Sequence, residues 1–512
     1  MLQIRDLNIR TTLDLRELIK EFSLTVNKGD KVVLIGEEGN GKSTILKWIY
    51  KPELIEDYTE VSGTCIKQNH IIGYLSQELS EEDKNKTVYE YLSEEEKFLE
   101  SNQKDISVIA SRLGVDRDLF YLNQYMRDLS GGERVKVSIA KILFSEADVL
   151  LLDEPTNDLD LKTVLWLEDF LIKSKEILIF VSHDEGLINK VANRIVHIEQ
   201  LKRKSESQIT ISSLSYEDYT TNREYLFNKQ AQQAQSDKKE FNKKMDRYRH
   251  VHDAVEHALK SASRQDPLAA RNLKDKMHTV KAMGKRFEKE KENLTKMPVI
   301  EEAIFLSFDE DIYLPPSKII LNYELDKLYS PDNKFLSSNL KLEVHGGDKI
   351  CIIGRNGIGK TTLLKKLYEE LRDRNDIKVF YMPQNYLEIL PLNKTPIDYL
   401  ADKGDKESIT KAREYLGSMR YTSDEMEHSI NELSGGQKAK LLFVKMLLER
   451  SNVLLLDEPT RNFSPLSQPV IRERLKEFKG CIVSISHDRK YLEEVVNVVY
   501  EMDERGLQKK KM

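Results

Sequence analysis

Gly36-Glu-Glu-Gly-Asn-Gly-Lys42-Ser43 is the stretch that decides the fold, because it follows the apolar run 31–35 and precedes a helical pattern. The same arrangement returns as Gly354-Arg-Asn-Gly-Ile-Gly-Lys360-Thr361 after the apolar run 349–353. Glycines in this pattern let the backbone curl, so that its N–H groups surround a phosphate at a helix N-terminus. One match could be a simple strand-to-helix turn, but two matches in the same context predict two phosphate-binding loops.

Other short motifs around these loops also occur twice, in the same order. They are Leu-Ser-Gly-Gly at 129–132 and 433–436, Val-Leu-Leu-Leu-Asp-Glu-Pro-Thr at 149–156 and 453–460, and Ser-His-Asp at 182–184 and 486–488. Ser130 of the first Leu-Ser-Gly-Gly motif precedes Asp153 by 23 positions, and Asp153 precedes His183 by 30. The spacings of the corresponding serine, aspartate and histidine in the second half are the same, 23 and 30. This agreement of order and spacing predicts the duplication of a whole domain.

The runs 147–152 and 177–182 are short and continuously apolar, which is typical of strands buried on both faces of a parallel sheet. Strands of this kind between helical segments predict α/β domains. We therefore expect two tandem α/β domains at residues 1–200 and 318–512, joined by a long antiparallel α-helical hairpin linker within 201–317.

The composition argues against a membrane or secreted protein. The chain has 512 residues, 39% hydrophobic and 32% charged, with a mean hydropathy of -0.53. No apolar run approaches the roughly 18 to 20 residues that cross a bilayer, and the first residues lack the pattern of a secretory signal. Three scattered cysteines, Cys65, Cys351 and Cys481, fit reduced thiols. We expect a cytoplasmic protein with no membrane partner.

Acidic and histidine residues end the predicted strands, where an open α/β sheet presents side chains to a ligand. An aspartate there suits Mg²⁺, and the glutamate after it can polarise the water that attacks a γ-phosphate. The histidine recurs at a fixed distance and is expected to contact the γ-phosphate, although a strand-end Asp-Glu-Pro can also simply start a turn. The predicted catalytic residues are Glu154, His183, Glu458 and His487, and the predicted metal ligands are Ser43, Gln77, Asp153, Thr361, Gln384 and Asp457.

Phosphate loops and Ser-Gly-Gly motifs supply the predicted nucleotide contacts. Ser-Gly-Gly followed by Glu133 or Gln437 is also a capping box of an ordinary helix, and both readings are compatible because a capped helix start can receive a phosphate. The predicted ATP-binding residues are Gly36, Gly39, Gly41, Lys42, Ser43, Thr44, Ser130, Gly131, Gly132, Gly354, Gly357, Gly359, Lys360, Thr361, Thr362, Ser434, Gly435 and Gly436.

Each half resembles an ATP-binding cassette. The features that carry the resemblance occur in order in both halves: the phosphate loop, a glutamine (Gln77 or Gln384), the Leu-Ser-Gly-Gly motif, called the signature, the Asp-Glu pair, and the histidine of Ser-His-Asp, called the switch histidine. The resemblance implies two tandem ATP-binding cassette domains that hydrolyse ATP with Mg²⁺. It also implies that loop 36–43 faces signature 434–437 and loop 354–361 faces 130–133, so that a monomer pairs its own cassettes. After Glu-Pro-Thr the halves differ, Asn-Asp-Leu-Asp in one and Arg461-Asn-Phe-Ser-Pro465 in the other, so equal hydrolysis at both sites is not implied.

Residues 218–262 and 267–297 carry apolar side chains, among them Val251 and Met283, at spacings of three and four, which predicts two helices with an apolar seam, separated by Arg264-Gln-Asp. Between Lys229 and Met297 there are 18 lysines and arginines against 10 aspartates and glutamates, in a chain whose net charge is -6. A solvated spacer is one interpretation. Basic charge with interleaved aromatic and histidine residues favours another, in which the segment binds RNA.

Paired cassettes joined by a basic helical hairpin resemble the F subfamily of ATP-binding cassette proteins. The resemblance implies a ribosome-associated ATPase that binds near the exit tRNA site, with the linker reaching rRNA and peptidyl-site tRNA at the peptidyl-transferase centre. The departure at 461–465 and the long hairpin look similar to antibiotic-resistance members that displace drugs. A housekeeping translation factor is the alternative, and the ATPase subunit of an exporter is an alternative of another class. Chromosome and repair ATPases have longer coils or zinc motifs, so no DNA partner is expected.

Overall fold

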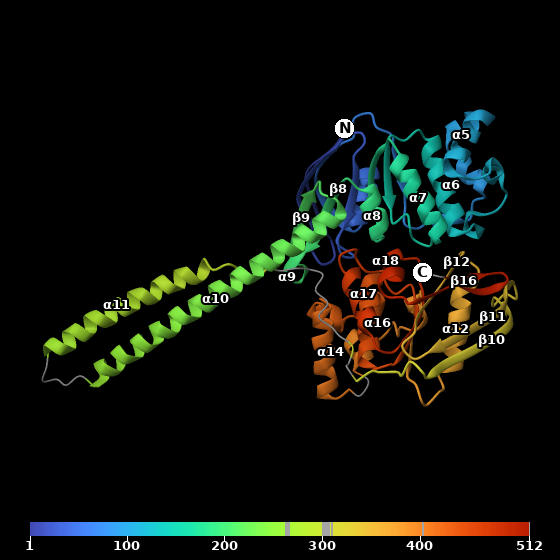
Figure 1. The fold of residues 1–512 in the computed structure, drawn as a ribbon. Helices are drawn as coiled ribbons and strands as arrows, with labels where there is room; N and C mark the ends of the chain where they lie inside the picture. The colour runs from blue at the N-terminus through green and yellow to red at the C-terminus, as the bar shows by residue number, and fades with distance from the viewer. Residues whose placement is uncertain (262–266, 299–307, 309–310, 402–403, 511–512) are drawn as a thin grey trace. The chain divides into compact units, whose positions relative to one another are not determined.

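The computed structural model describes residues 1–261, 267–298, 308, 311–401 and 404–510. The chain divides into two compact units, Met1–Tyr216 with Glu301–Met512, and Glu217–Ile300. The first unit contains two α/β halves, which we call cassette 1 and cassette 2 (Figure 1).

Cassette 1 is built on a six-stranded sheet in the order β5-β6-β7-β3-β8-β9, in which β9 is antiparallel to β8 and the other pairs are parallel. A second, antiparallel sheet has the order β2-β1-β4. The strands are β1 (Leu2–Thr11), β2 (Glu17–Val26), β3 (Lys31–Ile35), β4 (Thr59–Ile66), β5 (Ile72–Leu75), β6 (Val149–Asp153), β7 (Ile177–Val181), β8 (Arg194–Gln200) and β9 (Glu206–Ser212).

Helices cover this sheet, and every residue of the central strands β6 and β7 is buried, as their continuous apolar sequences predict. The helices of cassette 1 are α1 (Lys42–Tyr50), η1 (Pro52–Leu54), α2 (Glu81–Lys84), α3 (Val88–Ser93), α4 (Glu96–Glu100), α5 (Gln103–Leu113), η2 (Arg117–Tyr121), η3 (Met126–Asp128), α6 (Gly131–Phe144), α7 (Leu161–Lys173), α8 (Glu185–Val191) and α9 (Leu201–Lys204).

Cassette 2 repeats the architecture, with the sheet order β13-β14-β15-β12-β16-β17 and a separate pair β10-β11. Its strands are β10 (Ile319–Tyr329), β11 (Phe335–His345), β12 (Lys349–Gly354), β13 (Val379–Met382), β14 (Val453–Asp457), β15 (Cys481–Ile485), β16 (Val498–Asp503) and β17 (Gly506–Lys510). Its helices are α12 (Lys360–Leu371), η4 (Tyr386–Glu388), α13 (Pro396–Leu400), α14 (Lys406–Ser418), α15 (Ser423–Glu427), η5 (Ile430–Glu432), α16 (Gly435–Leu448), α17 (Gln468–Glu477) and α18 (Arg489–Glu494). The predicted fold class, two tandem α/β cassettes, is confirmed.

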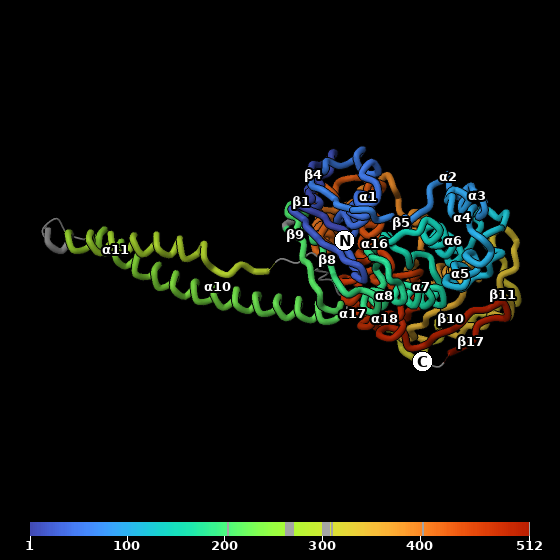
Figure 2. Tube along the Cα trace, turned by 90° about the horizontal axis from the view of Figure 1, so that it is seen from above, coloured from blue at the N-terminus to red at the C-terminus, as the bar shows by residue number. Residues whose placement is uncertain are grey.

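The second unit is a pair of antiparallel helices, α10 (Tyr216–Ser261) and α11 (Pro267–Glu292), which lie side by side in Figures 1 and 2. Phe287 of α11 meets the rings of Phe241 and Tyr248 of α10 edge to face, with centroids 6.5 and 5.7 Å apart. The predicted break at Arg264-Gln-Asp lies outside the described residues. The predicted helical pair is therefore present, held by aromatic contacts along its seam.

Two details of the predicted helical pair are wrong. The second helix ends at Glu292 rather than at Met297, because Thr295 turns toward α10 and donates its hydroxyl proton to Asp237 at 2.6 Å. Val251 and Met283, placed in the seam by their spacing, are 51% and 45% exposed. Within the described part of the chain, no helix combines the length and apolarity that a bilayer crossing requires.

Candidate nucleotide sites

Each phosphate loop joins a central strand to a helix, β3 to α1 and β12 to α12. A Cβ on Gly36 would lie 2.2 Å from the carbonyl oxygen of Ile198, and a Cβ on Gly354 would lie 2.5 Å from a carbonyl oxygen of β16, so both turns need glycine. Gly41 and Gly359 cap the two helices in the left-handed conformation, and neither helix start has a side-chain cap among the described residues. The first N–H groups are therefore available to an anion.

The loop lysines are held inside their loops. Lys42 Nζ donates to the carbonyls of Gly36 and Glu37 at 2.8 Å each, and Lys360 Nζ donates to the carbonyl of Gly354 at 2.7 Å. Both ammonium groups thus lie beside the uncapped helix starts, where a polyphosphate would be neutralised.

The structure brings the predicted metal ligands together in pairs. Ser43 Oγ donates to Asp153 at 2.9 Å, and Thr361 Oγ1 donates to Asp457 at 2.7 Å. Gln77 and Gln384 are exposed, just after β5 and β13. A hydroxyl paired with a carboxylate gives the oxygen donors that Mg²⁺ prefers, so these residues fit a magnesium ion.

The predicted catalytic glutamates both adopt strained backbone conformations, with φ of 49° at Glu154 and 53° at Glu458. Each sits near its switch histidine, but not equally. His183 Nε2 lies 3.0 Å from Glu154 Oε1, whereas His487 Nε2 lies 3.8 Å from Glu458 Oε1. The same pair of residues is closer in cassette 1 than in cassette 2.

The electrostatic environments of the two glutamates also differ. Burial acts to raise the pKa of Glu154, but the charge and hydrogen bond of His183, together with Lys42, bring it below the ordinary value. Burial and the charge of Asp457 raise the pKa of Glu458 to about 8. Burial, with the charge of Lys360, lowers the pKa of His487 to about 4. At neutral pH Glu154 is ionised, while Glu458 holds a proton.

The Ser-Gly-Gly motifs begin α6 and α16, and both are capping boxes. Ser130 accepts from the N–H of Glu133 at 3.3 Å, and the Glu133 carboxylate accepts from the N–H of Ser130 at 3.0 Å. Ser434 and Gln437 repeat the arrangement at 3.3 and 2.8 Å. The capping interpretation is therefore confirmed, and it leaves the helix starts facing the opposite cassette.

Site 1 is the site at Lys42, and the second cassette closes over its phosphate loop. The N–H of Gly436 donates to the carboxylate of Glu38, and Lys440 pairs with Glu37. The hydroxyls of Ser464 and Ser467 both donate to Glu37 Oε1 at 2.5 Å. Two carboxylates of the first loop therefore bind the signature helix and the segment after Glu-Pro-Thr in the other cassette.

Site 2 is the site at Lys360, and its contact with cassette 1 is looser. Asn356 Nδ2 donates to the carbonyl of Asp158 at 2.5 Å, while Arg461 and Gln384 of cassette 2 reach the Asp158 carboxylate at 2.9 and 3.4 Å. Both phosphate loops thus face the opposite cassette, in the head-to-tail order that the family resemblance implies.

The cavities reflect this difference. Site 2 opens into a cavity of about 520 Å³, the size of a small-molecule pocket, whereas the cavity at site 1 holds about 160 Å³. The predicted residues that line the larger cavity are Gly131, His183, Gly357, Gly359, Lys360, Thr361, Thr362, Gln384, Asp457, Glu458 and His487. Those that line the smaller one are Gly39, Gly41, Lys42, Ser43, Thr44, Gln77, Glu154 and His183. Ser130 and Gly132 line a cavity beside site 2, and Gly435 and Gly436 lie against Glu38.

Sequence reasoning missed the residues that join the cassettes at site 1. Glu37, Glu38, Ser464 and Ser467 were not among the predicted contacts, and neither was Gln468. Gln468 Nε2 donates to the carbonyl of His183 at 3.0 Å and to the carbonyl of Phe463 at 3.2 Å. Two acidic residues inside an anion-binding loop were the available signal, because a phosphate would repel them.

Comparison with known proteins places this geometry in a family. The family model described as "ABC transporter" matches residues 19–157 and 337–461, just over half of the chain. ABC transporter F family member 2 of Arabidopsis thaliana is 28% identical over 551 aligned positions, covering 98% of this chain and 76% of the relative. The probable ATP-binding protein YheS of Escherichia coli K12 is 28% identical over 527 positions, covering 96% and 77%.

A solved structure shows the same fold. The complex of the archaeal ribosomal stalk protein aP1 with the archaeal ribosome recycling factor aABCE1 contains a chain that superposes with a TM-score of 0.60 at 17% identity, covering 98% of this chain and 89% of that one. Both cassettes here bind ATP, and the chain hydrolyses it. With two phosphate loops that face the opposite signatures and a family match over half its length, this chain belongs to the ABC transporter family.

Proposed function

We propose that this chain is a ribosome-associated ATPase of the F subfamily, in which ATP draws the two cassettes together and hydrolysis lets them part. Similarity to F-family members along nearly the whole chain supports this proposal. Two similar folds belong to the recycling factor aABCE1 and to a model of ribosome-bound archaeal Pelota and ABCE1. The proposed division is cassette 1 at 1–200, the linker at 201–317 and cassette 2 at 318–512, with the first boundary moved to Ser212 because β9 pairs with β8 in the sheet of cassette 1.

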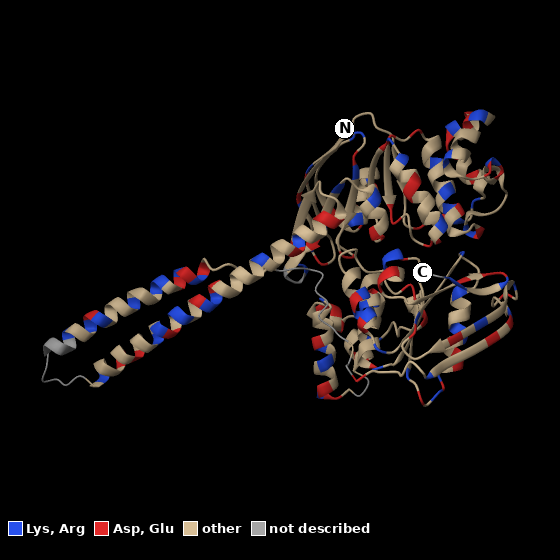
Figure 3. Cartoon of the chain, in the orientation of Figure 1, with Lys and Arg blue, Asp and Glu red and all other residues tan. Residues whose placement is uncertain are grey.

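The observation that carries the ribosomal partner is the charge of the helical pair. Lysine and arginine residues lie along both α10 and α11 in Figure 3. Between Lys229 and Met297 there are 18 lysines and arginines against 10 aspartates and glutamates. Lys243 and Arg247 on α10 and Lys281 and Lys285 on α11 are exposed. Basic side chains on both helices match the backbone of rRNA and of peptidyl-site tRNA.

The chain's own residues supply the proposed chemistry. Lys42 and Lys360 and the uncapped helix starts bind the phosphates, while Ser130 and Ser434 present the opposite helix starts to the γ-phosphate. Water attacks the γ-phosphorus, and the bond to the bridging oxygen breaks to give ADP and phosphate. At site 1 Glu154 orients that water and takes its proton, and at site 2 Glu458 can do so only in its ionised form. The switch histidine beside each glutamate contacts the γ-phosphate.

Mg²⁺ is the proposed metal, held by Ser43, Asp153 and Gln77 at site 1 and by Thr361, Asp457 and Gln384 at site 2. The ion neutralises charge on the phosphates when bound. Asp153 and Asp457 already orient the hydroxyls of the loop, and burial raises the pKa of both carboxyls. A divalent cation would offset that burial penalty.

Within this function, we propose that the helical pair acts at the peptidyl-transferase centre and displaces bound antibiotics from a cytoplasmic ribosome. Its two long paired helices and the divergent segment Arg461 to Pro465 support this choice over a housekeeping translation factor. A housekeeping role is the second candidate, since the similar relatives are described as F-family or ATP-binding proteins.

Ribosome binding is tested with E154Q/E458Q, which we expect to bind ATP without hydrolysing it. We expect the variant to sediment with ribosomes in ATP, and binding to weaken steeply as salt rises. Adding K243Q/R247Q/K281Q/K285Q should weaken sedimentation by at least about tenfold. The control K28Q/K104Q/K175Q/K509Q removes the same charge from exposed cassette lysines and should sediment normally.

Recovery of the E154Q/E458Q variant in membranes, or no ribosome in the pellet at any salt, would discard the ribosomal proposal in favour of an exporter subunit. Antibiotic displacement is tested by expressing the wild-type chain and measuring susceptibility to drugs that bind near the peptidyl-transferase centre. Unchanged susceptibility to all of them would select the housekeeping role.

A further inference from the structure

A set of ion pairs joins the cassettes immediately behind the two switch histidines. Corresponding positions in the two cassettes are 304 residues apart, as His183 and His487 show. By this spacing Glu168 corresponds to Arg472, Glu185 to Arg489, and Lys190 to Glu494. At each of the three positions the two cassettes carry opposite charge.

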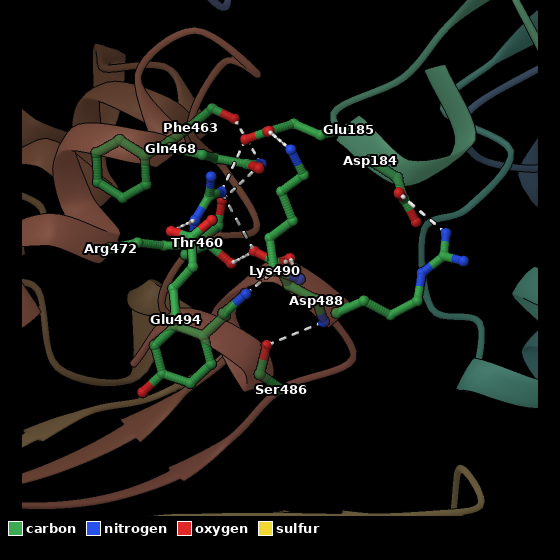
Figure 4. Close-up of polar contacts among 12 residues, drawn as sticks. Asp184, Glu185, Thr460, Phe463, Gln468, Arg472, Ser486, Asp488, Lys490 and Glu494 are labelled. Atoms are coloured by element: carbon green, nitrogen blue, oxygen red, sulfur yellow. Dashed lines mark hydrogen bonds and ion pairs between the residues drawn. The ribbon is translucent and has the colours of Figure 1, made fainter. Parts of the chain in front are cut away.

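Two of these positions meet across the cassette interface. Arg472 Nη1 lies 2.7 Å from Glu185 Oε1, and both side chains are at least 95% buried. Figure 4 shows Glu185 directed toward Arg472 and Lys490 of cassette 2. The symmetry-related contact pairs Arg489 with Glu168, whose side chain is 4% exposed. Each cassette therefore contributes one residue to each of two buried interfacial ion pairs.

The residue at the third position forms an ion pair with the residue at the first position of the same cassette. Lys190 lies 2.9 Å from Glu168 in cassette 1, and Glu494 lies 2.9 Å from Arg472 in cassette 2. Cassette 1 thus presents two carboxylates backed by a lysine, and cassette 2 presents two guanidinium groups backed by a glutamate. At these three positions the geometry has been kept and the charge reversed, whereas Asp184 and Asp488, which lie 3.6 Å from Arg489 and 3.9 Å from Arg472, keep the same charge in both cassettes.

We propose that these two clusters determine which cassettes can pair. Opposite charge at equivalent positions allows cassette 1 to close on cassette 2, but not on a second copy of itself. In a pair of like cassettes the same contacts would be Glu168 with Glu185, or Arg472 with Arg489. Either combination buries two charges of the same sign, which disfavours the complex strongly. Since Glu185 and Arg489 each stand two residues after a switch histidine, correct closure also positions both histidines. This inference concerns the cassettes alone and holds whether or not the chain binds a ribosome.

The test exchanges the clusters in the full chain and measures ATP hydrolysis. E168R/E185R/K190E gives both cassettes the basic cluster, and R472E/R489E/E494K gives both the acidic one. Each half-exchange should lower hydrolysis by at least about thirtyfold, because both buried pairs become repulsive. The full exchange carries all six substitutions together with K490E, because Lys490 also lies 3.4 Å from Glu185, and it restores complementary pairs with reversed polarity. It should return hydrolysis to within about threefold of wild type.

A second variant tests the same proposal with fewer substitutions, so that the conclusion does not depend on whether the full exchange folds. E168R/K190E/R489E reverses one of the two interfacial pairs and keeps both complementary, so it should also hydrolyse ATP within about threefold of wild type, while E168R alone should not. Thermal melting and circular dichroism establish that every variant is folded. The proposal is overturned if the half-exchanges hydrolyse ATP normally, or if folded complementary variants are as inactive as the half-exchanges.

Discussion

Sites 1 and 2 share their motifs and spacings, yet the structure closes one and leaves the other open. At site 1 the loop carboxylates of Glu37 and Glu38 bind cassette 2, and the cavity is about 160 Å³. At site 2 the corresponding loop residues are Arg355 and Asn356, and the cavity is about 520 Å³. Duplication has preserved the residues that handle phosphate, while the residues between them decide how firmly each loop is held by the opposite cassette.

The difference centres on Glu37. Burial acts to raise the pKa of its carboxyl, but Lys440 and the hydroxyls of Ser464 and Ser467 lower that pKa to about 2. Arg355, in contrast, pairs with Glu504 at the surface, where both side chains are more than 60% exposed. A buried ion pair across an interface has far more effect when broken than an exposed pair within one cassette.

The largest expected effect comes from breaking the buried pair. E37Q removes the buried carboxylate that pairs with Lys440 and accepts from Ser464 and Ser467, so we expect a loss of about 3 to 5 kcal/mol in the stability of the cassette unit. The matched substitution R355Q should change it by less than about 0.5 kcal/mol. Thermal unfolding without nucleotide measures both, and equal shifts would contradict the assigned role of Glu37.

The pH dependence of stability sharpens the contrast at the catalytic glutamates. Folded Glu458 titrates at about 8, against an ordinary value of 4.5, so between these values the unfolded state binds fewer protons than the folded state. The contribution of Glu458 to the free energy of unfolding therefore falls as pH rises, by on the order of 3 kcal/mol between pH 4.5 and 7. His487, with a folded pKa of about 4, contributes in the opposite direction over part of this range. The difference in unfolding free energy between wild type and E458Q, measured without nucleotide, isolates the contribution of Glu458 and should fall with pH by that amount. A difference that does not change with pH would contradict this titration of Glu458.

Hydrolysis should depend more on site 1 than on site 2. Glu154 is ionised and close to His183, so E154Q is expected to lower phosphate release about 100-fold at pH 7. E458Q should lower it by a smaller factor, because Glu458 holds a proton at that pH in the nucleotide-free chain. Steady-state phosphate release at saturating ATP distinguishes the two, and a larger loss in E458Q would reverse the assignment.

The smallest expected effect concerns Glu38. Its carboxylate accepts from the N–H of Gly436 at the start of α16, the place proposed for a γ-phosphate. E38A should free that helix start and tighten ATP binding at site 1 about fivefold. N356A at the matching position of site 2 should not tighten binding. Titration of each variant with a fluorescent ATP analogue, in an E154Q/E458Q background, measures the change.

The fold and the positions of the phosphate contacts could be predicted because local sequence dictates them. A glycine-rich turn between a buried strand and a helix has few conformations, and the strand ends place Asp153 and Asp457 beside it. The partners of Glu37 could not be predicted in this way, since Lys440 and Ser467 lie about 400 residues after Glu37 in the sequence. Their contact depends on the mutual orientation of two folded cassettes. The end of the second linker helix also escaped prediction, because Asp237 on α10 competes for Thr295.

The hydrogen bond from Gln468 to the peptide carbonyl of His183 links the position of the switch histidine to the closure of the cassettes. The amide belongs to one cassette and the histidine to the other, so parting the halves removes the support behind the imidazole. We therefore expect a molecule with parted cassettes to bind ATP without hydrolysing it.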